Sequence, residues 1–393
     1  MRFQFIRKAS FWRQTMMAGA TTLAFAASAP ASAEVTVGVI LSLTGPAASL
    51  GQPAENTVKL WPQEIGGEPA RVIIMNDGSD PTEAGRLASK LISEEKVDVL
   101  VGSSITPPSI AIMEVAGRNK TPLVSLGGGN AIIEPQEGSR TWAFKIPAPE
   151  ALSVQRVIKD MKDRNIKRVG VIAVTTGYGE GFLKAFQDQA KEAGIEIPVT
   201  ARIGAQDISA TTQALQVMAA KPDAVYIFSF GTPGATPQLE LVKRGYKGTI
   251  YQTHGVANAD YLRIGGKAVE GTRLAVAPVL VAEQLPEDHP TKKAGMEYVT
   301  QYESEYGDGS RSLFGSTAWT AYSMLNAAIP VAMESAKPGT LEFRQALRDA
   351  LENMEEVVSP EGVFNMSPEN HNGLDERGQV MVSVENGKWT LEQ

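Results

Sequence analysis

Residues 251–266 read YQTHGVANADYLRIGG and contain His254, one of only three histidines in the chain. The hydrophobic run that ends at His254 is predicted to be a strand, and a loop with a glycine follows it. A histidine at such a place serves as a general base, a metal ligand, a ligand contact or a buried structural residue. The types and spacing of the other polar residues indicate which of these four roles is expected.

The sequence lacks the residue patterns of nucleophilic and metal-dependent catalysis. It has no cysteine, no G-x-S-x-G nucleophile motif and no H-E-x-x-H zinc motif. His289 and His371 lie in polar loops, where we expect both to be solvated. The glycines of TGYGEG (176–181) are one residue short of the dinucleotide-binding spacing. We therefore predict no enzyme activity, no metal and no cofactor, although a hydrolase that pairs His254 with Asp260 stays a minor alternative.

One loop carries hydroxyl groups that suit an anion. VGSSITPPS (101–109) contains the end of a predicted strand, a turn rich in hydroxyls and the start of a helix. The hydroxyls of Ser103, Ser104 and Thr106, with the free N–H groups of the helix start, are donors for a carboxylate. Thr106 is also predicted to be the N-cap of the helix, with Pro107 as the first helical residue. Ordinary capping and turn chemistry is the competing explanation.

A glycine loop follows the next predicted strand. SLGGGN (125–130) contains Gly127, Gly128 and Gly129, which allow the backbone to approach a ligand closely. Both loops follow the carboxyl ends of strands, which is where open α/β sheets bind ligands. The sequence therefore favours an anion-binding site at this edge of a sheet.

Near-continuous apolar runs alternate with amphipathic helical patterns along most of the chain. The runs predicted as strands are VTVGVIL (35–41), ARVIIMN (70–76), VDVLVGS (97–103), TPLVSL (121–126), RVGVIAV (168–174), DAVYIFSF (223–230), GTIYQTH (248–254) and GTRLAVAPV (271–279). Continuous hydrophobicity indicates strands that are buried on both faces of a parallel sheet. The proline-containing segment 144–161 interrupts the first sheet and opens a long helix. We therefore predict the α/β class, with two doubly wound parallel sheets.

The last part of the chain returns to helices and ends in a hairpin. Helical patterns cover 316–336 and 341–354, and Asn386-Gly387 is predicted to be the turn of a C-terminal hairpin. About 360 residues after the N-terminal leader exceed what one hydrophobic core usually supports. We therefore expect two lobes, between which the chain crosses more than once.

The first 33 residues have the pattern of a secretory signal peptide. Four basic residues and no acidic one lie in this leader, an apolar run covers 16–29, and Ala31-Ser32-Ala33 forms a cleavage motif. We predict export to the periplasm with cleavage after Ala33, and the lack of cysteine excludes a lipid-modified N-terminus. The exported chain then has a net charge of −11, because 33 basic residues face 44 acidic ones. No nucleic-acid partner is expected at this charge.

Seven stretches of the chain resemble, in the same order, the periplasmic leucine/isoleucine/valine-binding protein family of ABC transporters. They are SLTGPAASLGQ (42–52), DGSDPTEAGRLASKLI (77–92), VDVLVGSSITPPS (97–109), TPLVSL (121–126), YGEGF (178–182), PDAVYI (222–227) and GVANADYL (255–262). The resemblance implies a type I periplasmic-binding fold whose two lobes close on a small ligand. It implies lobes of 34–147 plus 275–360 and of 148–274 plus 361–393, with crossovers near 145–150, 272–278 and 358–363. The implied partner is an ABC permease, and we expect a monomer.

The resemblance also implies ligand contacts. By position in the motifs these are Leu50, Thr106, Gly127, Gly128, Gly129, Tyr178 and Phe230. The hydroxyl-rich turn adds Ser104, and the end of the run 248–254 adds His254. Thr106 matches the family's carboxylate-binding hydroxyl, and Tyr178 matches the aromatic residue that covers the ligand.

Two departures from the family pattern change the expected ligand. Members that bind amino acids have an acidic residue, which pairs with the ammonium, at the position of His254. A buried ammonium without that partner costs several kcal/mol. The loop threonine of the family is replaced here by Gly129, which leaves room for a larger body. We therefore expect a carboxylate without an amine, such as an aromatic acid of the benzoate or hydroxycinnamate type.

Three alternatives stay open at this point. The ligand could be a branched-chain amino acid, the chain could be a ligand-sensing domain of the same fold, or His254 could only cap its own loop.

Overall fold

The computed structural model describes residues 34–392, so the predicted signal peptide, with its cleavage after Ala33, lies outside the described residues. Strands β1 to β6 are Val35–Leu41, Glu64–Ile65, Glu68–Asn76, Val99–Gly102, Leu123–Ser125 and Ala143–Lys145. Strands β7 to β15 are Val169–Val174, Thr200–Ile203, Ala224–Phe228, Thr249–Gln252, Arg273–Val276, Val357–Val358, Val363–Phe364, Val380–Glu385 and Lys388–Leu391. Helices α1 to α11 are Ala48–Lys59, Pro81–Ser93, Thr106–Arg118, Glu150–Asp163, Gly177–Ala193, Thr211–Ala219, Ala235–Lys243, Ala259–Gly265, Lys292–Tyr306, Leu313–Met333 and Leu341–Glu352.

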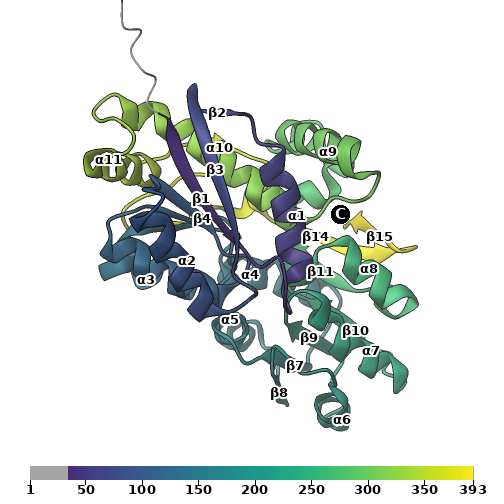
Figure 1. Cartoon of the computed structure of the whole chain (residues 1–393). Coiled ribbons are helices and arrows are strands. Elements are labelled where there is room, and N and C mark those ends of the chain that lie inside the picture. Colours follow the sequence, from purple (N-terminus) through teal and green to yellow (C-terminus); the bar gives the residue numbers. More distant parts are fainter. Residues whose placement is uncertain (1–33, 393) are drawn as a thin grey trace, which may run out of the picture. The chain divides into compact units, whose positions relative to one another are not determined.

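Two sheets contain these strands, apart from the short β12–β13 pair (Figure 1). The first sheet has the strand order β2-β3-β1-β4-β5-β6, and the second has the order β15-β14-β11-β10-β9-β7-β8. In the first sheet β1 pairs in parallel with β3 and β4, and in the second β9 pairs in parallel with β7 and β10. The predicted α/β class with doubly wound parallel sheets is confirmed. Antiparallel β14 and β15 extend the edge of the second sheet beside β11.

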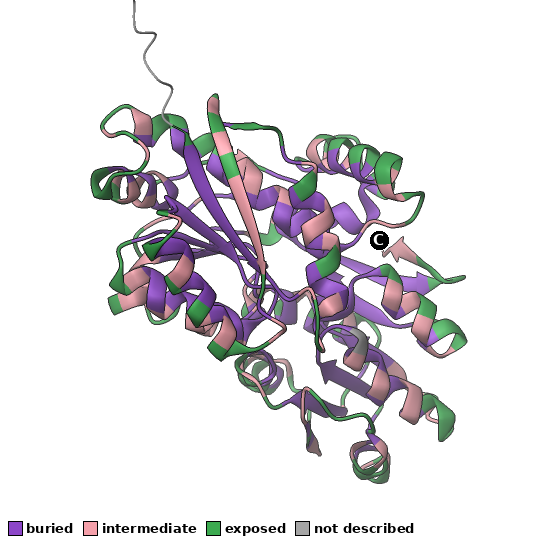
Figure 2. Ribbon diagram, in the orientation of Figure 1, coloured by how far each residue is buried: buried purple, intermediate pink, exposed green. Residues whose placement is uncertain are grey.

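Helices cover both faces of each sheet, and the strands are therefore mostly buried (Figure 2). On the first sheet α2 and α3 share one buried cluster with the strands, and α1, α10 and α11 share another. On the second sheet α4, α5 and α6 pack into one cluster, and α9 belongs to another with β11 and β14. The residue boundaries of the two lobes stay a prediction.

Strand β3 differs from the expectation of burial on both faces. Its residues are intermediate or exposed along the whole strand, as its colours in Figure 2 show. The reason is its place in the sheet, since only the two-residue strand β2 lies outside it. Apolar composition alone does not distinguish a central strand from one next to an edge.

Two local predictions in the first sheet are wrong. The segment 144–161 was expected to interrupt the sheet, but its first two residues belong to β6, which pairs in parallel with β5. Helix α3 begins at Thr106, with Ile105 as its N-cap, so Thr106 and not Pro107 is the first helical residue. The Thr106 hydroxyl does not cap its own helix, because its oxygen accepts a hydrogen bond from the Gly129 backbone instead.

The predicted C-terminal elements are confirmed. Helices α10 and α11 correspond to the helical patterns at 316–336 and 341–354. Strands β14 and β15 form an antiparallel hairpin, and both turn residues, Asn386 and Gly387, have positive φ as the Asn-Gly turn requires. Within residues 34–392, no helix combines the length and the hydropathy that crossing a bilayer needs.

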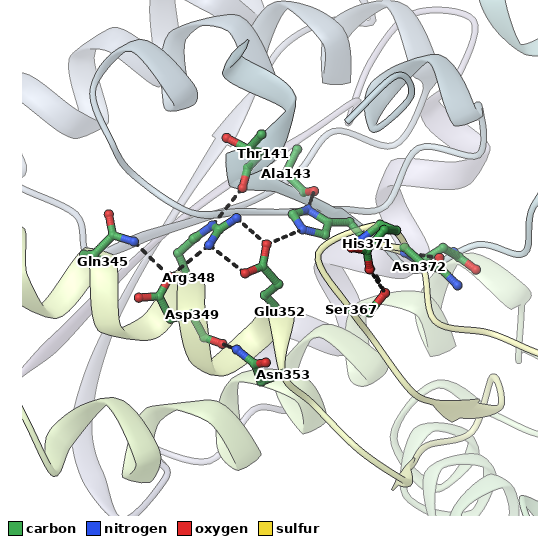
Figure 3. Close-up of polar contacts among 12 residues, drawn as sticks. Thr141, Ala143, Gln345, Arg348, Asp349, Glu352, Asn353, Ser367, His371 and Asn372 are labelled. Carbon is green, nitrogen blue, oxygen red and sulfur yellow. Dashed lines mark hydrogen bonds and ion pairs between the residues drawn. The ribbon is translucent and has the colours of Figure 1, made fainter. Parts of the chain in front are cut away.

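His371 is buried, which corrects the prediction that it is solvated. Its ring lies between Ala143 and Glu352 (Figure 3). Nδ1 is 2.9 Å from the carbonyl oxygen of Ala143, and Nε2 is 3.0 Å from Glu352 Oε1. Arg348 donates to both oxygens of the same carboxylate and to the carbonyl oxygen of Thr141. These hydrogen bonds join the C-terminal segment that contains His371 to β6 and α11. His289 is partly exposed.

Candidate ligand-binding site

A small cavity, about 20 Å³ in volume, lies where several predicted site residues meet. It is lined by Leu50, Ser104, Ile105, Thr106, Leu126, Gly128, Pro147, Tyr178, Phe230, His254, Gly255, Leu313, Phe314 and Thr317. Seven of the nine predicted site residues are in this lining, and Gly127 and Gly129 are not. A volume of this size holds about one water molecule and is well below that of small-molecule sites, so a ligand needs the walls of the cavity to move apart.

Most of the lining residues lie in loops that follow parallel strands or in the first turns of the helices after those loops. Ser104 and Thr106 follow β4, Gly128 follows β5, and Pro147 follows β6 in the first sheet. In the second sheet Tyr178 follows β7, Phe230 follows β9 and His254 follows β10. The carboxyl ends of the strands of both sheets thus supply one cavity, as the topology of open α/β sheets favours.

Two hydroxyls of the lining have the same hydrogen-bonding state. Ser104 Oγ accepts a hydrogen bond from the Ser42 backbone N–H at 3.2 Å, and Thr106 Oγ1 accepts one from the Gly129 N–H at 3.0 Å. Within residues 34–392 neither hydroxyl proton has an acceptor. A hydroxyl has one proton and two lone pairs, so each group is left as a donor toward the cavity. Two convergent donors suit a carboxylate.

The three glycines of the loop have different surroundings. A Cβ on Gly127 would lie 2.6 Å from Ser109 Oγ, and one on Gly129 would lie 2.7 Å from Thr106 Oγ1. Gly128 alone is in the lining, where a Cβ would lie 2.8 Å from Tyr178 Cε2 and 3.0 Å from His254 Nε2. Gly127 and Gly129 therefore let the loop pack against α3, and Gly128 keeps space open between the loop and the aromatic wall.

Aromatic rings form one wall of the cavity. The Tyr178 ring makes edge-on contacts with Phe230 at 5.9 Å and with His254 at 5.7 Å between centroids. The Tyr178 hydroxyl accepts a hydrogen bond from the Gly255 N–H at 3.2 Å, which fixes the ring. Burial raises the pKa of Tyr178, so its hydroxyl stays protonated. This wall presents ring edges and faces to a flat apolar body.

The His254 imidazole is neutral at ordinary pH. Burial and, to a smaller extent, the nearby Lys145 ammonium lower the pKa of His254 to about 3. No hydrogen bond joins the imidazole to its own loop within the described residues, and its side chain is not a cap there. A neutral imidazole has one donor and one acceptor nitrogen, so it accepts only one hydrogen bond.

The start of α10 supplies three lining residues that the sequence analysis did not find. They are Leu313, Phe314 and Thr317, and α10 begins after Ser312, whose hydroxyl accepts from the Gly315 N–H at 3.1 Å. The serine before an apolar helix was a usable signal for the helix start. Nothing local in the sequence indicates that this helix end reaches a cavity whose other lining residues lie between Leu50 and Gly255.

The cavity lining contains no aspartate or glutamate. A buried carboxyl, Glu361, lies behind it, where Ser316 and Thr317 bond to its Oε1 at 2.5 and 2.9 Å. In the described part of the chain, no group of three or more metal-ligating side chains is gathered in one place. The polar groups that face the cavity are therefore hydroxyls, backbone groups and one neutral imidazole.

Comparison with known proteins gives the family. Residues 34–388 match the family described as periplasmic binding protein. The solved structure of an extracellular ligand-binding receptor from Rhodopseudomonas palustris is 39% identical, with a TM-score of 0.89, and 92% of this chain and 99% of that chain are covered. The Leu/Ile/Val-binding protein homolog 3 of Brucella melitensis is 26% identical over 266 residues, which cover 65% of this chain and 70% of that protein.

A more distant solved structure shares the fold. It is the solute-binding protein of an ABC transporter from Rhodopseudomonas palustris in complex with 3,4-dihydroxybenzoic acid, 22% identical, with a TM-score of 0.76 over 91% of this chain and 95% of that chain.

The chain belongs to the periplasmic binding protein family, and its fold is the type I periplasmic-binding fold. Members of this family in ABC transporters are periplasmic, bind small ligands and deliver them to a permease. Family members are solute-binding proteins and not enzymes.

Proposed function

We propose that this chain binds a small organic carboxylate without an amino group, with an aromatic acid as the preferred ligand, and delivers it to an ABC permease. The observation that carries the proposal is the pairing of two hydroxyl donors, on Ser104 and Thr106, with an aromatic wall and no carboxylate in the same lining. In the proposed complex the ligand carboxylate accepts from these hydroxyls. The ring lies against Tyr178 and Phe230.

The expected energies are sufficient for transport. Burial of about 150 Å² of an aromatic ring contributes around 4 kcal/mol at roughly 25 cal/mol per Å². Hydrogen bonds to the charged carboxylate add about 1.5–3 kcal/mol each before the cost of association. Micromolar affinity needs about 8 kcal/mol. The fold accommodates such a ligand, since a relative with the same fold holds 3,4-dihydroxybenzoic acid.

The transport cycle that we propose has the ligand enclosed between two lobes, 34–147 plus 275–360 and 148–274 plus 361–393. The chain acts as a monomer, released into the periplasm by cleavage after Ala33. The second candidate ligand is a branched-chain amino acid, which the name of the Brucella relative favours. That ligand would need a partner for its ammonium, and His254 is the polar residue at the matching position.

Calorimetric titration of the purified protein with benzoate, 4-hydroxybenzoate and leucine tests the proposal. We expect binding of one or both aromatic acids in the micromolar range and leucine binding weaker by about a hundredfold or more, because the ammonium has no acidic partner. Leucine binding as tight as that of either aromatic acid would overturn the proposed ligand class and leave the family assignment intact.

Gly128→Ala tests the place of the ligand. The added methyl would meet Tyr178 and His254 at 3.0 Å or less, so we expect benzoate affinity to fall about tenfold or more, measured by the same titration. Gly85→Ala is the matched control, because a Cβ there meets nothing closer than 3.8 Å. An unchanged affinity in Gly128→Ala would contradict binding in this cavity.

A further inference from the structure

Lys145 is a fully buried lysine behind the wall of the cavity. It is the last residue of β6, and its Nζ donates to three backbone carbonyl oxygens, those of Gly128 at 3.2 Å, Pro147 at 2.6 Å and Ala148 at 3.2 Å. An ammonium has three protons, so all of its donors are used by the backbone. In residues 34–392 no carboxylate lies within ion-pair distance of this ammonium.

The Gly128 carbonyl that accepts from Lys145 is linked through one peptide unit to Thr106, the proposed hydrogen-bond donor to the ligand carboxylate. The carbonyl of Gly128 and the N–H of Gly129 belong to one peptide unit. That N–H donates to Thr106 Oγ1 at 3.0 Å, while the carbonyl accepts from Lys145. A charge-assisted bond at one end of a peptide polarises the bond at the other end, and chains of hydrogen bonds strengthen one another. The Thr106 proton is the free end of this chain.

We propose that Lys145 is a positioning residue for anion recognition, which acts through the Gly128–Gly129 peptide to make the Thr106 hydroxyl a donor of fixed direction and raised strength. The proposal rests on the carboxylate ligand proposed above. A buried anion needs a positive charge nearby. In this proposal that charge lies on Lys145, which does not touch the ligand. Lys145 thereby selects a carboxylate over a neutral group of the same shape.

The charges around Lys145 agree with this role. Burial lowers the pKa of Lys145 to about 8, against the opposing effect of the Glu150 and Glu134 carboxylates. Glu150 accepts from the Asn130 N–H at 2.9 Å, so it is held at the end of the same glycine loop. The ammonium also acts on His254 across the cavity and lowers its pKa. A bound anion would add a further negative charge near this cation, beside those of Glu150 and Glu134.

The test compares benzoate with benzamide, its neutral analogue of nearly the same shape, in Lys145→Gln. Glutamine keeps N–H donors for the carbonyls and removes the charge. We expect benzoate affinity to fall about tenfold or more and benzamide affinity by about threefold or less, since only the carboxylate uses the charge. Lys159→Gln, which removes an exposed lysine of α4, should leave both affinities unchanged.

Thr106→Val measures whether the charge acts through the hydroxyl. Alone, Thr106→Val should lower benzoate affinity as strongly as Lys145→Gln does. Combined with Lys145→Gln, it should lower benzoate affinity little further, because both substitutions break the same chain of hydrogen bonds. Equal losses for benzoate and benzamide in Lys145→Gln, or additive losses in the double variant, would overturn the proposal. Benzoate binding by the wild type would still support the proposed function.

A titration of a folded protein decides the matter if Lys145→Gln does not fold. Glu361→Gln is used as the background, because the Glu361 carboxyl also titrates beside the cavity. Between pH 7 and 9.5 the Lys145 ammonium is lost, while His254 stays neutral and Tyr178 stays protonated. We expect the preference for benzoate over benzamide to fall about tenfold across this range. A constant preference would overturn the role of Lys145.

Discussion

Replacing His254 with glutamate is expected to abolish benzoate binding and to let the cavity bind leucine. The new carboxylate would face the cavity near the place where the ligand carboxylate binds, and like charges in a desolvated site repel by several kcal/mol. We expect benzoate affinity to fall at least about a hundredfold, and leucine to bind at micromolar concentrations as its ammonium gains a partner. The Lys145 ammonium near position 254 helps to keep this glutamate ionised.

His254→Gln is the matched control for this prediction. Glutamine is uncharged, as the buried imidazole is, and it offers a donor and an acceptor at a similar distance from the backbone. We expect it to retain benzoate affinity within about tenfold and to gain no leucine affinity. Calorimetric titration of both variants with both ligands checks the pair of outcomes. If His254→Glu bound benzoate as tightly as the wild type, residue 254 would not face the ligand.

The strand and helix positions were predictable because the relevant forces are local or periodic. Continuous apolar runs identify buried parallel strands, and the predicted run 35–41 matches β1 residue for residue. Gly194 has positive φ at the end of α5, as expected for a C-cap glycine. The exposure of β3 and the pairing of β6 could not be predicted, because the place of a strand in a sheet depends on its partners. Burial on a given face is a tertiary property that the composition of a run does not contain.

The candidate site was predictable where it lies in loops after strands. The turn with Ser104 and Thr106, the glycine loop and His254 line one cavity, and topology alone brings such loops to one edge. Phe314 and Thr317 could not be found, since they reach the cavity only through the packing of α10 on α1. The same holds for Lys145, which reads as a surface lysine in the sequence and becomes a buried cation only when β6 joins the sheet.

Glu361 is the buried carboxyl for which the largest pH effect on stability is expected. Burial raises the pKa of Glu361 from 4.5 to about 7, against the hydrogen bonds from Ser316 and Thr317, which lower it. Thr317 Oγ1 lies 2.9 Å from both Glu361 Oε1 and the carbonyl oxygen of Leu313. A hydroxyl has one proton, so both contacts are satisfied at once when Glu361 carries a proton and donates it to Thr317 while Thr317 donates to Leu313.

The sign of the pH effect follows from the raised pKa. The folded chain binds a proton at Glu361 between pH 4.5 and about pH 7, where the unfolded chain has lost it. The stabilisation is therefore fully present below pH 4.5 and is lost as the pH rises through 7. The difference in pKa corresponds to roughly 3 kcal/mol of unfolding free energy between the two limits.

Glu361→Gln is expected to remove this pH dependence. Urea unfolding at pH 5 and at pH 8 should give a wild-type free energy of unfolding that falls, relative to Glu361→Gln, by roughly 2.5 kcal/mol between the two pH values. Glu305→Gln, which changes an exposed carboxylate on α9, should follow the wild type at both pH values. If the wild type and Glu361→Gln differ by the same amount at pH 5 and at pH 8, Glu361 does not titrate in this range.

Because Thr317 lines the cavity, the same ionisation should weaken benzoate binding above pH 7 in the wild type and not in Glu361→Gln.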